Sequence, residues 1–146
     1  LAERLGGREV RPREVTTERT CSSLYVEVPF HQDLSYLNIG ERTNANGSKA
    51  FREAMLAGNI DDCVEIAKGQ ARDGAHVLDL CVDYVGRDGI SDMEELAGRL
   101  STAVTLPIVL DSTEPQVLQA GLEKLAGRCV INSVNYIVPV SKTGLH

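Results

Sequence analysis

Four polar residues stand directly after four short apolar runs, and this repeated placement is the clearest chemical signal in the sequence. Each apolar run is paired with the residue that follows it: Ile39-Gly40 with Glu41, Val77-Leu78 with Asp79, Val109-Leu110 with Asp111, and Val130-Ile131 with Asn132. If the runs are parallel strands of one sheet, their carboxyl ends lie at the same edge, where ligands bind in such folds. The sequence therefore predicts a site lined by hydrogen-bonding side chains.

The chemistry open to such a site follows from the groups in it. A carboxylate has two acceptor oxygens, and an amide has one acceptor and two donors. A heterocycle edge with adjacent N–H donors, as in pterins and guanines, can be held by two parallel bonds to a carboxylate. Asp111 suits this role, with Asn132 beside it on the next strand. An acid–base pair of Glu41 and Asp111 has less support, because sequence spacing does not give their separation.

A structural role for the same carboxylates is the main alternative. An aspartate at a strand end can cap the following helix or accept a hydrogen bond from a loop N–H. For Asp79 and Asp83 the functional and structural interpretations have equal weight. Asp111 precedes Thr113, which is expected to cap its own helix, so Asp111 is freer to bind a ligand.

The elements that must position these residues alternate between residues 36 and 136. Strands are predicted at residues 37–40, 76–78, 107–110 and 129–131, and helices at about 48–57, 60–73, 91–103 and 113–127. Ser91 and Thr113 each begin a capping box, whereas Gly58 and Gly74 end the first two helices.

This order of strands and helices predicts an α/β fold. The strands are short and apolar throughout, as in parallel sheets that are buried on both faces. Two architectures remain, a doubly wound sheet and a (β/α)₈ barrel. The glycine-rich turn of dinucleotide-binding sheets is absent after the first strand, which favours the barrel.

The composition excludes several classes of partner. The chain has 146 residues, of which 42% are hydrophobic and 25% charged, with a net charge of −6. An acidic chain of this kind is not expected to bind nucleic acid or a membrane, and neither a membrane span nor a secretory signal is visible. Cys21, Cys63, Cys81 and Cys129 show no metal-binding spacing. We expect no metal site, reduced thiols and a cytoplasmic location.

Residues 1–35 differ from the rest of the chain. Arginine and glutamate alternate there without a sustained apolar period, which predicts a linker from an upstream module. Residues 23–26 are interpreted as a short extended piece. Because the first residue is Leu1 rather than methionine, we expect the start to derive from a longer chain.

Four segments resemble, in order and spacing, the pterin-binding domain of the cobalamin-dependent methionine synthase family. They are residues 38–49 (NIGERTNANGSK), 77–84 (VLDLCVDY), 107–113 (PIVLDST) and 130–135 (VINSVN). One such segment alone has little specificity, whereas the set covers residues 36–136. The resemblance implies a (β/α)₈ barrel that binds 5-methyltetrahydrofolate at its C-terminal mouth. The methyl group then passes to cob(I)alamin on a separate module and on to homocysteine, and zinc belongs to a neighbouring module.

The resemblance also assigns residues to the site. Asp111 and Asn132 match the pterin-holding residues and are the catalytic candidates, and Glu41 matches a glutamate at the same mouth. Lys49 could attract the acidic glutamate tail of folate. The complete set expected to bind the folate is Glu41, Asn44, Gly47, Ser48, Lys49, Asp79, Cys81, Asp111, Asn132 and Ser133.

The sequence departs from the family pattern at two places. Cys81 stands where many members have asparagine, and a thiol is a weaker hydrogen-bond donor. After Tyr136 the family pattern is lost, so residues 137–146 are interpreted as an aberrant tail. We therefore expect residues 36–136 to form the first four strands of the barrel, in a fragment that is inactive by itself.

Two alternatives to a methionine synthase domain remain. The first is a truncated, non-catalytic pterin-binding fragment. The second is a related pterin barrel, such as a corrinoid methyltransferase or dihydropteroate synthase. Dihydropteroate synthase lacks the Gly-Glu-Arg-x-Asn segment that begins at Gly40, and a separate corrinoid methyltransferase does not need the linker ahead of the barrel.

Overall fold

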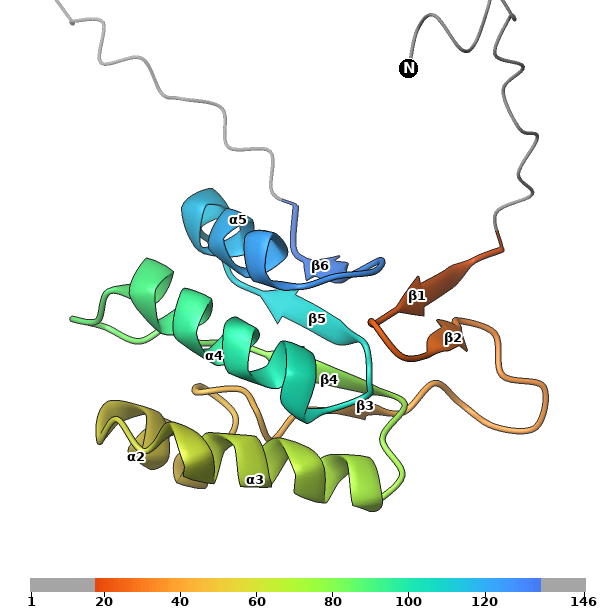
Figure 1. Cartoon of the computed structure of the whole chain (residues 1–146), viewed down its shortest axis with the longest axis horizontal. Coiled ribbons are helices and arrows are strands. Elements are labelled where there is room, and N and C mark those ends of the chain that lie inside the picture. Colours follow the sequence, from red (N-terminus) through yellow and green to blue (C-terminus); the bar gives the residue numbers. More distant parts are fainter. Residues whose placement is uncertain (1–17, 135–146) are drawn as a thin grey trace, which may run out of the picture.

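A parallel four-stranded sheet with helices between its strands forms the centre of the molecule (Figure 1). The computed structural model describes residues 18–134. The sheet has the order β3 (Ile39–Gly40), β4 (Val77–Leu80), β5 (Ile108–Asp111) and β6 (Val130–Asn132). The helices are α2 (Lys49–Leu56), α3 (Ile60–Arg72), α4 (Gly89–Ala103) and α5 (Pro115–Lys124). The predicted α/β class and the predicted strands and helices are confirmed, with shifts of a few residues at their ends.

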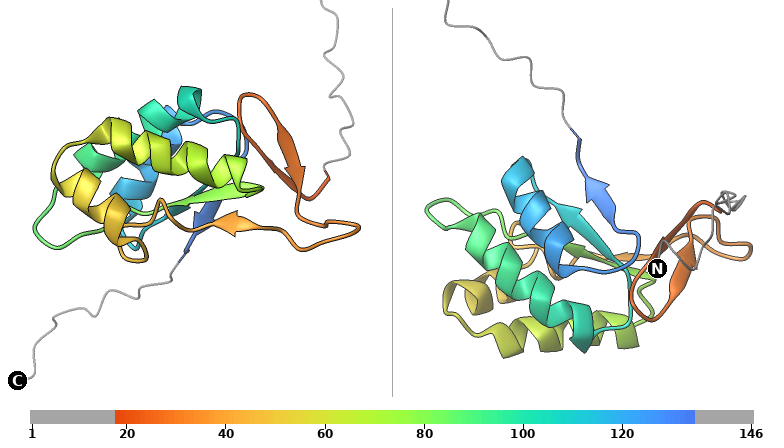
Figure 2. Two further views of the ribbon diagram at one scale, coloured as in Figure 1. Left: turned by 90° about the horizontal axis from the view of Figure 1, so that it is seen from below. Right: turned by 45° about the horizontal axis from the view of Figure 1, so that its top comes forward.

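Helices α2 to α5 all pack on the same face of the sheet (Figure 2). Successive strand residues point to opposite faces. Leu78 and Leu110 belong to the core cluster that includes buried residues of every helix, whereas Val77 and Val109 belong to a second cluster. A doubly wound sheet has helices on both faces. Sequential strand order with helices on one face is consistent with part of a (β/α)₈ barrel.

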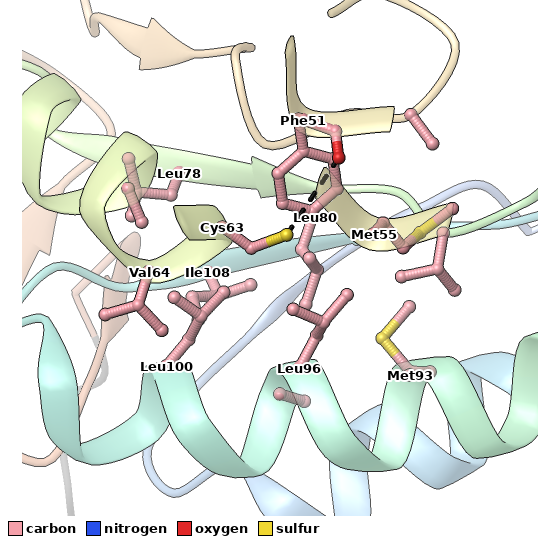
Figure 3. Close-up of a cluster of buried hydrophobic side chains, with 14 of the residues drawn as sticks. Phe51, Met55, Cys63, Val64, Leu78, Leu80, Met93, Leu96, Leu100 and Ile108 are labelled. Carbon is pink, nitrogen blue, oxygen red and sulfur yellow. Dashed lines mark hydrogen bonds between the residues drawn. The ribbon is translucent and has the colours of Figure 1, made fainter. Parts of the chain in front are cut away.

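The core between helices and sheet is built from large apolar side chains (Figure 3). Those labelled there are Phe51, Met55, Cys63, Val64, Leu78, Leu80, Met93, Leu96, Leu100 and Ile108. Burying one such side chain fully contributes about 1.5–3 kcal/mol. The Cys63 thiol donates a weak hydrogen bond to the Phe51 carbonyl oxygen at 3.9 Å, which joins α3 to α2.

Two helices begin differently from the prediction. Asp88 is the N-cap of α4, and its carboxylate accepts from the N–H groups of Ile90 at 3.2 Å and Ser91 at 3.3 Å. Ser91 therefore lies inside the helix, because an aspartate three residues earlier supplies the cap. Helix α5 has Glu114 as its N-cap residue, so Thr113 is not the cap.

Other predicted helix boundaries are confirmed. Ser48 is the N-cap of α2, and its hydroxyl accepts from the Phe51 N–H at 3.3 Å. Gly58 and Gly74 follow the ends of α2 and α3 with φ values of 73° and 91°. These lie in the left-handed region that glycine adopts without steric cost.

An antiparallel hairpin occupies part of the range predicted as a linker. Strand β1 (Thr20–Ser22) pairs with β2 (Glu27–Pro29), and residues 23–26 form the turn between them. The interpretation of residues 23–26 as an extended piece is therefore wrong. The Ser23 hydroxyl accepts from the N–H groups of Tyr25 at 3.0 Å and Val26 at 3.1 Å, which bends the chain back. Residues 1–17 lie outside the described residues.

The hairpin covers the N-terminal end of the sheet, as Figure 1 shows. Buried Cys21 packs against Val77 and Val109 on the face opposite the helices. The Ser22 N–H donates to the Arg128 carbonyl oxygen at 3.0 Å, which fixes β1 beside the chain that leads into β6. The hairpin thus shields apolar strand residues that the helices do not reach.

The predicted tail at residues 137–146 lies outside the described residues. Within residues 18–134, no helix combines the length and the apolar character that crossing a bilayer requires.

Gly121 allows α5 to approach the sheet closely. A Cβ atom there would stand 2.6 Å from Leu110 Cδ2 and 3.2 Å from Met93 Cγ. We expect Gly121→Ala to lower the free energy of unfolding by about 1–3 kcal/mol, because overpacking outweighs the gain in helix propensity. Gly98→Ala in α4 is the matched control. A Cβ atom at Gly98 meets nothing within 4 Å, so that variant should gain up to about 1 kcal/mol. Urea unfolding of both variants measures these changes, and equal signs would contradict the close packing of α5.

Candidate functional site

The four polar residues lie on the face of the sheet that the helices do not cover, but they are not all level. Gly40 pairs with Leu78, so Glu41 lies level with Asp79. Asp111 pairs with Asn132. Between these two pairs the register steps, because Asp79 lies opposite Val109 rather than Asp111. The four residues therefore stand at the same edge of the sheet, in two pairs that lie at different heights along the strands. A stagger between neighbouring strands is a property of barrel sheets.

Asn44 bridges this step in the register. Its side-chain Nδ2 donates to Asp79 Oδ2 at 2.8 Å and to Asp111 Oδ2 at 3.0 Å. One amide therefore uses both of its N–H groups to join carboxylates on two adjacent strands. The structure brings these three predicted residues together, and the remaining carboxylate oxygens still have lone pairs for a ligand.

The backbone around Asn44 is held firmly to β4. The Cys81 N–H donates to the Thr43 carbonyl oxygen at 3.2 Å, and the Ala45 N–H donates to the Cys81 carbonyl oxygen at 2.9 Å. Asn44 Oδ1 accepts from the N–H groups of Asn46 at 2.9 Å and Gly47 at 3.1 Å. The whole Asn44 side chain is thus engaged, which sets its orientation before any ligand arrives.

The strand-end residues Glu41, Asp79, Asp111 and Asn132 and the bridging Asn44 are called the polar cluster. Within it, the pKa of Asp79 is shifted by its surroundings. The Asp79 side chain is only 7% exposed. Burial raises the pKa of Asp79, the hydrogen bond from Asn44 opposes the rise, and the charges of Asp111 and Glu41 add to it. Two neighbouring acidic groups beside a buried carboxyl favour a retained proton. A cationic or N–H-bearing ligand edge would relieve this accumulation of negative charge.

Replacing Asp79 by asparagine should therefore change how stability depends on pH. Because the folded chain binds the Asp79 proton more tightly than the unfolded chain, stability falls as pH rises from the ordinary aspartate pKa through the raised one. Asp79→Asn keeps an acceptor for Asn44 and removes this loss. We expect the variant to gain stability relative to the native chain as the pH rises above the ordinary aspartate pKa of about 4.

Urea unfolding across this pH range measures the effect. Glu95→Gln on α4 is the control, because it removes an exposed carboxylate far from the site. A constant difference between Asp79→Asn and the native chain at every pH would contradict a raised pKa for Asp79.

Cys81 is buried beneath the loop that carries Asn44. Burial raises the pKa of the Cys81 thiol to about 12, and the charges of Asp111, Asp83 and Asp79 contribute to the rise. The thiol is therefore protonated at neutral pH. Asn46 Nδ2 donates to Cys81 Sγ at 3.5 Å, so the sulfur acts here as a weak acceptor that supports the loop.

Asn132 and Ser133 lie at the end of β6, and both are exposed. The Asn132 carbonyl oxygen accepts from the Ser112 N–H at 2.9 Å, which continues the pairing of β6 with β5. Asn132 therefore stands beside Asp111, as the sequence predicts. Glu41 is also exposed and lies at the opposite edge of the sheet, next to Asp79.

The loop residues predicted to lie near a folate have different surroundings. Gly47 belongs to the turn held by Asn44. The Ser48 hydroxyl is the cap of α2, so its first role is structural. Lys49 is exposed and forms an ion pair with Glu53 at 3.7 Å along the same helix. An exposed pair of this kind is weak, and Lys49 can exchange Glu53 for another carboxylate.

Asp83 has the structural role that the sequence left open. Its carboxylate accepts from the Ser112 hydroxyl at 2.8 Å and from the Thr113 N–H at 3.2 Å. The Ser112 hydroxyl in turn accepts from the Glu114 N–H at 3.1 Å. Asp83 therefore ties the end of β4 to the loop before α5, which keeps Asp111 in place at the end of β5.

A cleft of about 550 Å³ is beside this tie, between the loops that follow β4 and β5. It is lined by Asn46, Asp83, Tyr84, Val85, Gly86, Arg87, Gly89, Thr113 and Glu114. Its volume lies within the range of small-molecule sites. Asn46 borders the cleft and also contacts Cys81, so the cleft is next to the polar cluster.

Sequence reasoning missed two buried polar residues behind the site, Thr43 and Gln70. The buried face of α3 consists of Cys63, Val64, Ala67 and Gln70. The available signal was the spacing of Gln70, which lies three positions after Ala67 and therefore on the same face of the helix. Its partners lie on another element, so periodicity alone does not reveal its role.

Comparison with known proteins assigns the chain to a family. A family model described as pterin binding enzyme matches residues 40–142. The chain belongs to the pterin-binding enzyme family. The matched region begins at the end of β3 and includes every residue of the polar cluster.

Two methionine synthases are among the proteins similar to this chain. The methionine synthases of Mycobacterium tuberculosis (strain ATCC 25618 / H37Rv) and Mycobacterium leprae (strain TN) are each 68% identical to the chain over 124 residues. That alignment covers 85% of this chain and 10% of each relative. The resemblance to methionine synthase is confirmed, and the chain spans about a tenth of the length of the curated relatives it matches.

Proposed function

We propose that this chain binds 5-methyltetrahydrofolate through the polar cluster at the strand ends, as part of a methionine synthase. The methyl group would pass to cob(I)alamin on another module of the same enzyme and then to homocysteine. The observation that carries this proposal is the Asn44 amide that joins Asp79 and Asp111 at 2.8 and 3.0 Å. The similarity to two methionine synthases supports the choice of substrate.

The proposed binding mode uses the geometry of these residues directly. The pterin ring presents adjacent N–H donors along one edge, and Asp111 accepts two of them in parallel. Asn132 lies beside Asp111 and offers both a donor and an acceptor to the same ring. Because Asn44 already orients the carboxylates, little ordering cost remains when the ligand binds.

The proposed chemical role is to make the methylated ring nitrogen a better leaving group. Hydrogen bonding or proton donation to the pterin lowers the cost of the negative charge that develops as the methyl group departs. Asp111 and Asn132 are the proposed catalytic residues, because they contact the ring in this binding mode. Oriented side chains around the pterin replace water as the stabilising environment. Cobalamin supplies the nucleophile that accepts the methyl group.

Three broader proposals accompany this function. The sheet is proposed to be the first half of a (β/α)₈ barrel over residues 36–136, and the stagger between β4 and β5 supports it. Zinc is proposed to belong to another module of the full-length enzyme. The four free cysteines support a cytoplasmic location.

A hybrid enzyme tests the function most directly. Residues 36–134 of this chain would replace the matching segment of the Mycobacterium tuberculosis methionine synthase, and methyl transfer from 5-methyltetrahydrofolate would be measured. We expect activity within about tenfold of the parent enzyme. A tenfold change in rate corresponds to only about 1.4 kcal/mol of activation free energy. A folded hybrid that still binds cobalamin but transfers no methyl group would contradict the proposal.

A further inference from the structure

Gln70 is a buried polar residue on the face of α3 that packs towards the sheet. It is 5% exposed and follows Cys63, Val64 and Ala67 on the same buried face. A buried amide is costly unless its donor and acceptor groups have partners. The hydrogen bonds of Gln70 therefore indicate why a glutamine, rather than an apolar residue, occupies this position.

Both ends of the Gln70 amide contact the loop that carries Asn44. Gln70 Oε1 accepts from the Arg42 N–H at 2.6 Å, and Gln70 Nε2 donates to Thr43 Oγ1 at 3.3 Å. The Thr43 hydroxyl then donates to the Asp79 carbonyl oxygen at 2.6 Å. A continuous set of hydrogen bonds thus joins α3, the two residues before Asn44 and the backbone of Asp79.

Gly40 provides the space for this arrangement. A Cβ atom at Gly40 would stand 2.8 Å from Gln70 Oε1 and 3.1 Å from Leu78 Cδ2. Because Gln70 Oε1 is the free end of a flexible side chain, it would move away rather than force the strand apart. That movement would break its hydrogen bond with the Arg42 N–H.

We propose that Gln70 is a positioning residue for the pterin site, acting through Thr43 to fix the Asn44 amide between Asp79 and Asp111. This inference rests on the proposed function for its effect on ligand affinity. The Gln70 amide holds the two residues before Asn44, with Thr43 also held by the Cys81 N–H, and the Ala45 N–H bond to the Cys81 carbonyl oxygen holds the residue after it. With both sides held, the Asn44 side chain keeps its bonds to two carboxylates that lie on different strands.

Two substitutions interrupt the set of hydrogen bonds at different points. Gln70→Met keeps the length of the side chain and removes both hydrogen bonds to the loop. Gly40→Ala keeps Gln70 and displaces its amide, so it tests the proposal even where Gln70→Met fails to fold. Gln119→Met on α5 is the matched control, because Gln119 is exposed and its Nε2 donates to Glu123 rather than to the site.

Nitrogen-15 NMR of the full chain, without ligand, reads the position of Asn44 directly. Its side-chain amide signal can be assigned by its loss in Asn44→Ser. In Gln70→Met and Gly40→Ala we expect this signal to shift and its exchange with water to become about tenfold faster, as expected when about one hydrogen bond's stabilisation is lost. Gln119→Met should leave it unchanged. An unchanged Asn44 signal in both site variants would overturn the proposal.

Titration with 5-methyltetrahydrofolate separates this inference from the proposed function. We expect Gln70→Met to weaken binding about tenfold when Asn44 is present. In a chain that already carries Asn44→Ser, the same substitution should weaken binding no more than about twofold, because the effects of coupled residues do not add. A purely structural role would weaken both by the same factor, which would overturn positioning through Asn44. If the Asn44 signal shifts but the native chain binds no folate, the proposed function fails and the positioning of Asn44 by Gln70 stands.

Discussion

Asp111→Ala is expected to weaken the binding of 5-methyltetrahydrofolate by about 100-fold or more. In the proposed binding mode Asp111 accepts two charge-assisted hydrogen bonds from the pterin edge, and each such bond contributes about 1.5–3 kcal/mol. The substitution also removes one of the two carboxylates that orient Asn44. Isothermal titration calorimetry measures the change in affinity.

Asp111→Asn refines this test. The asparagine keeps one acceptor oxygen but has lost the second, so it should retain part of the affinity and bind about tenfold more weakly than the native chain. Glu123→Gln on α5 is the control, because it removes one exposed carboxylate away from the strand ends. Equal affinities for the native chain and Asp111→Ala would exclude Asp111 from the pterin site.

The second large effect is expected at Gly127, where the chain passes beside the hairpin. Gly127 has a φ of 91°, and a Cβ atom there would clash with the Ser22 carbonyl oxygen. The left-handed conformation costs a non-glycine residue about 1–2 kcal/mol, and overpacking adds about 1–3 kcal/mol. Gly127→Ala should therefore lower the free energy of unfolding by about 2–5 kcal/mol.

Gly86→Ala separates the two causes. Gly86 has a φ of 83°, but a Cβ atom there meets nothing within 4 Å. This control should lose only about 1–2 kcal/mol in urea unfolding. Labelling of Cys21 by a thiol reagent reports the hairpin itself, since Cys21 is a residue of β1 and is fully buried where the hairpin packs on the sheet. Equal losses of stability and equal labelling rates in the two variants would show that the hairpin does not depend on this contact.

The sequence predicted the sheet and its helices because those elements carry local signals. Val77-Leu78 and Val109-Leu110 are apolar runs followed by aspartate, and Gly58 and Gly74 mark helix ends with their positive φ. The hairpin escaped prediction because its strands have three residues each. The residues it packs against, Val77 and Val109, lie far away in the sequence.

The sequence predicted which polar residues stand at the strand ends, but not how they lie relative to one another. Asp79 and Asp111 were singled out as strand-end residues, but the register between β4 and β5 is set by strand pairing that no local pattern reveals. The hydrogen bonds from Asn44 to Asp79 and Asp111 span this step in the register between β4 and β5. Gln70 was missed for the same reason, since its partners Arg42 and Thr43 lie on a loop before α2.

The central claim is that the strand-end cluster binds a pterin, and one titration tests it most directly. Calorimetry with 5-methyltetrahydrofolate would be run on the native chain, on the hybrid methionine synthase and on the Asp111→Ala variant of each. We predict saturable binding at one site, weakened by about 100-fold in the Asp111→Ala variants. Absence of binding by both the chain and the folded hybrid, or binding that Asp111→Ala leaves unchanged, would contradict the account.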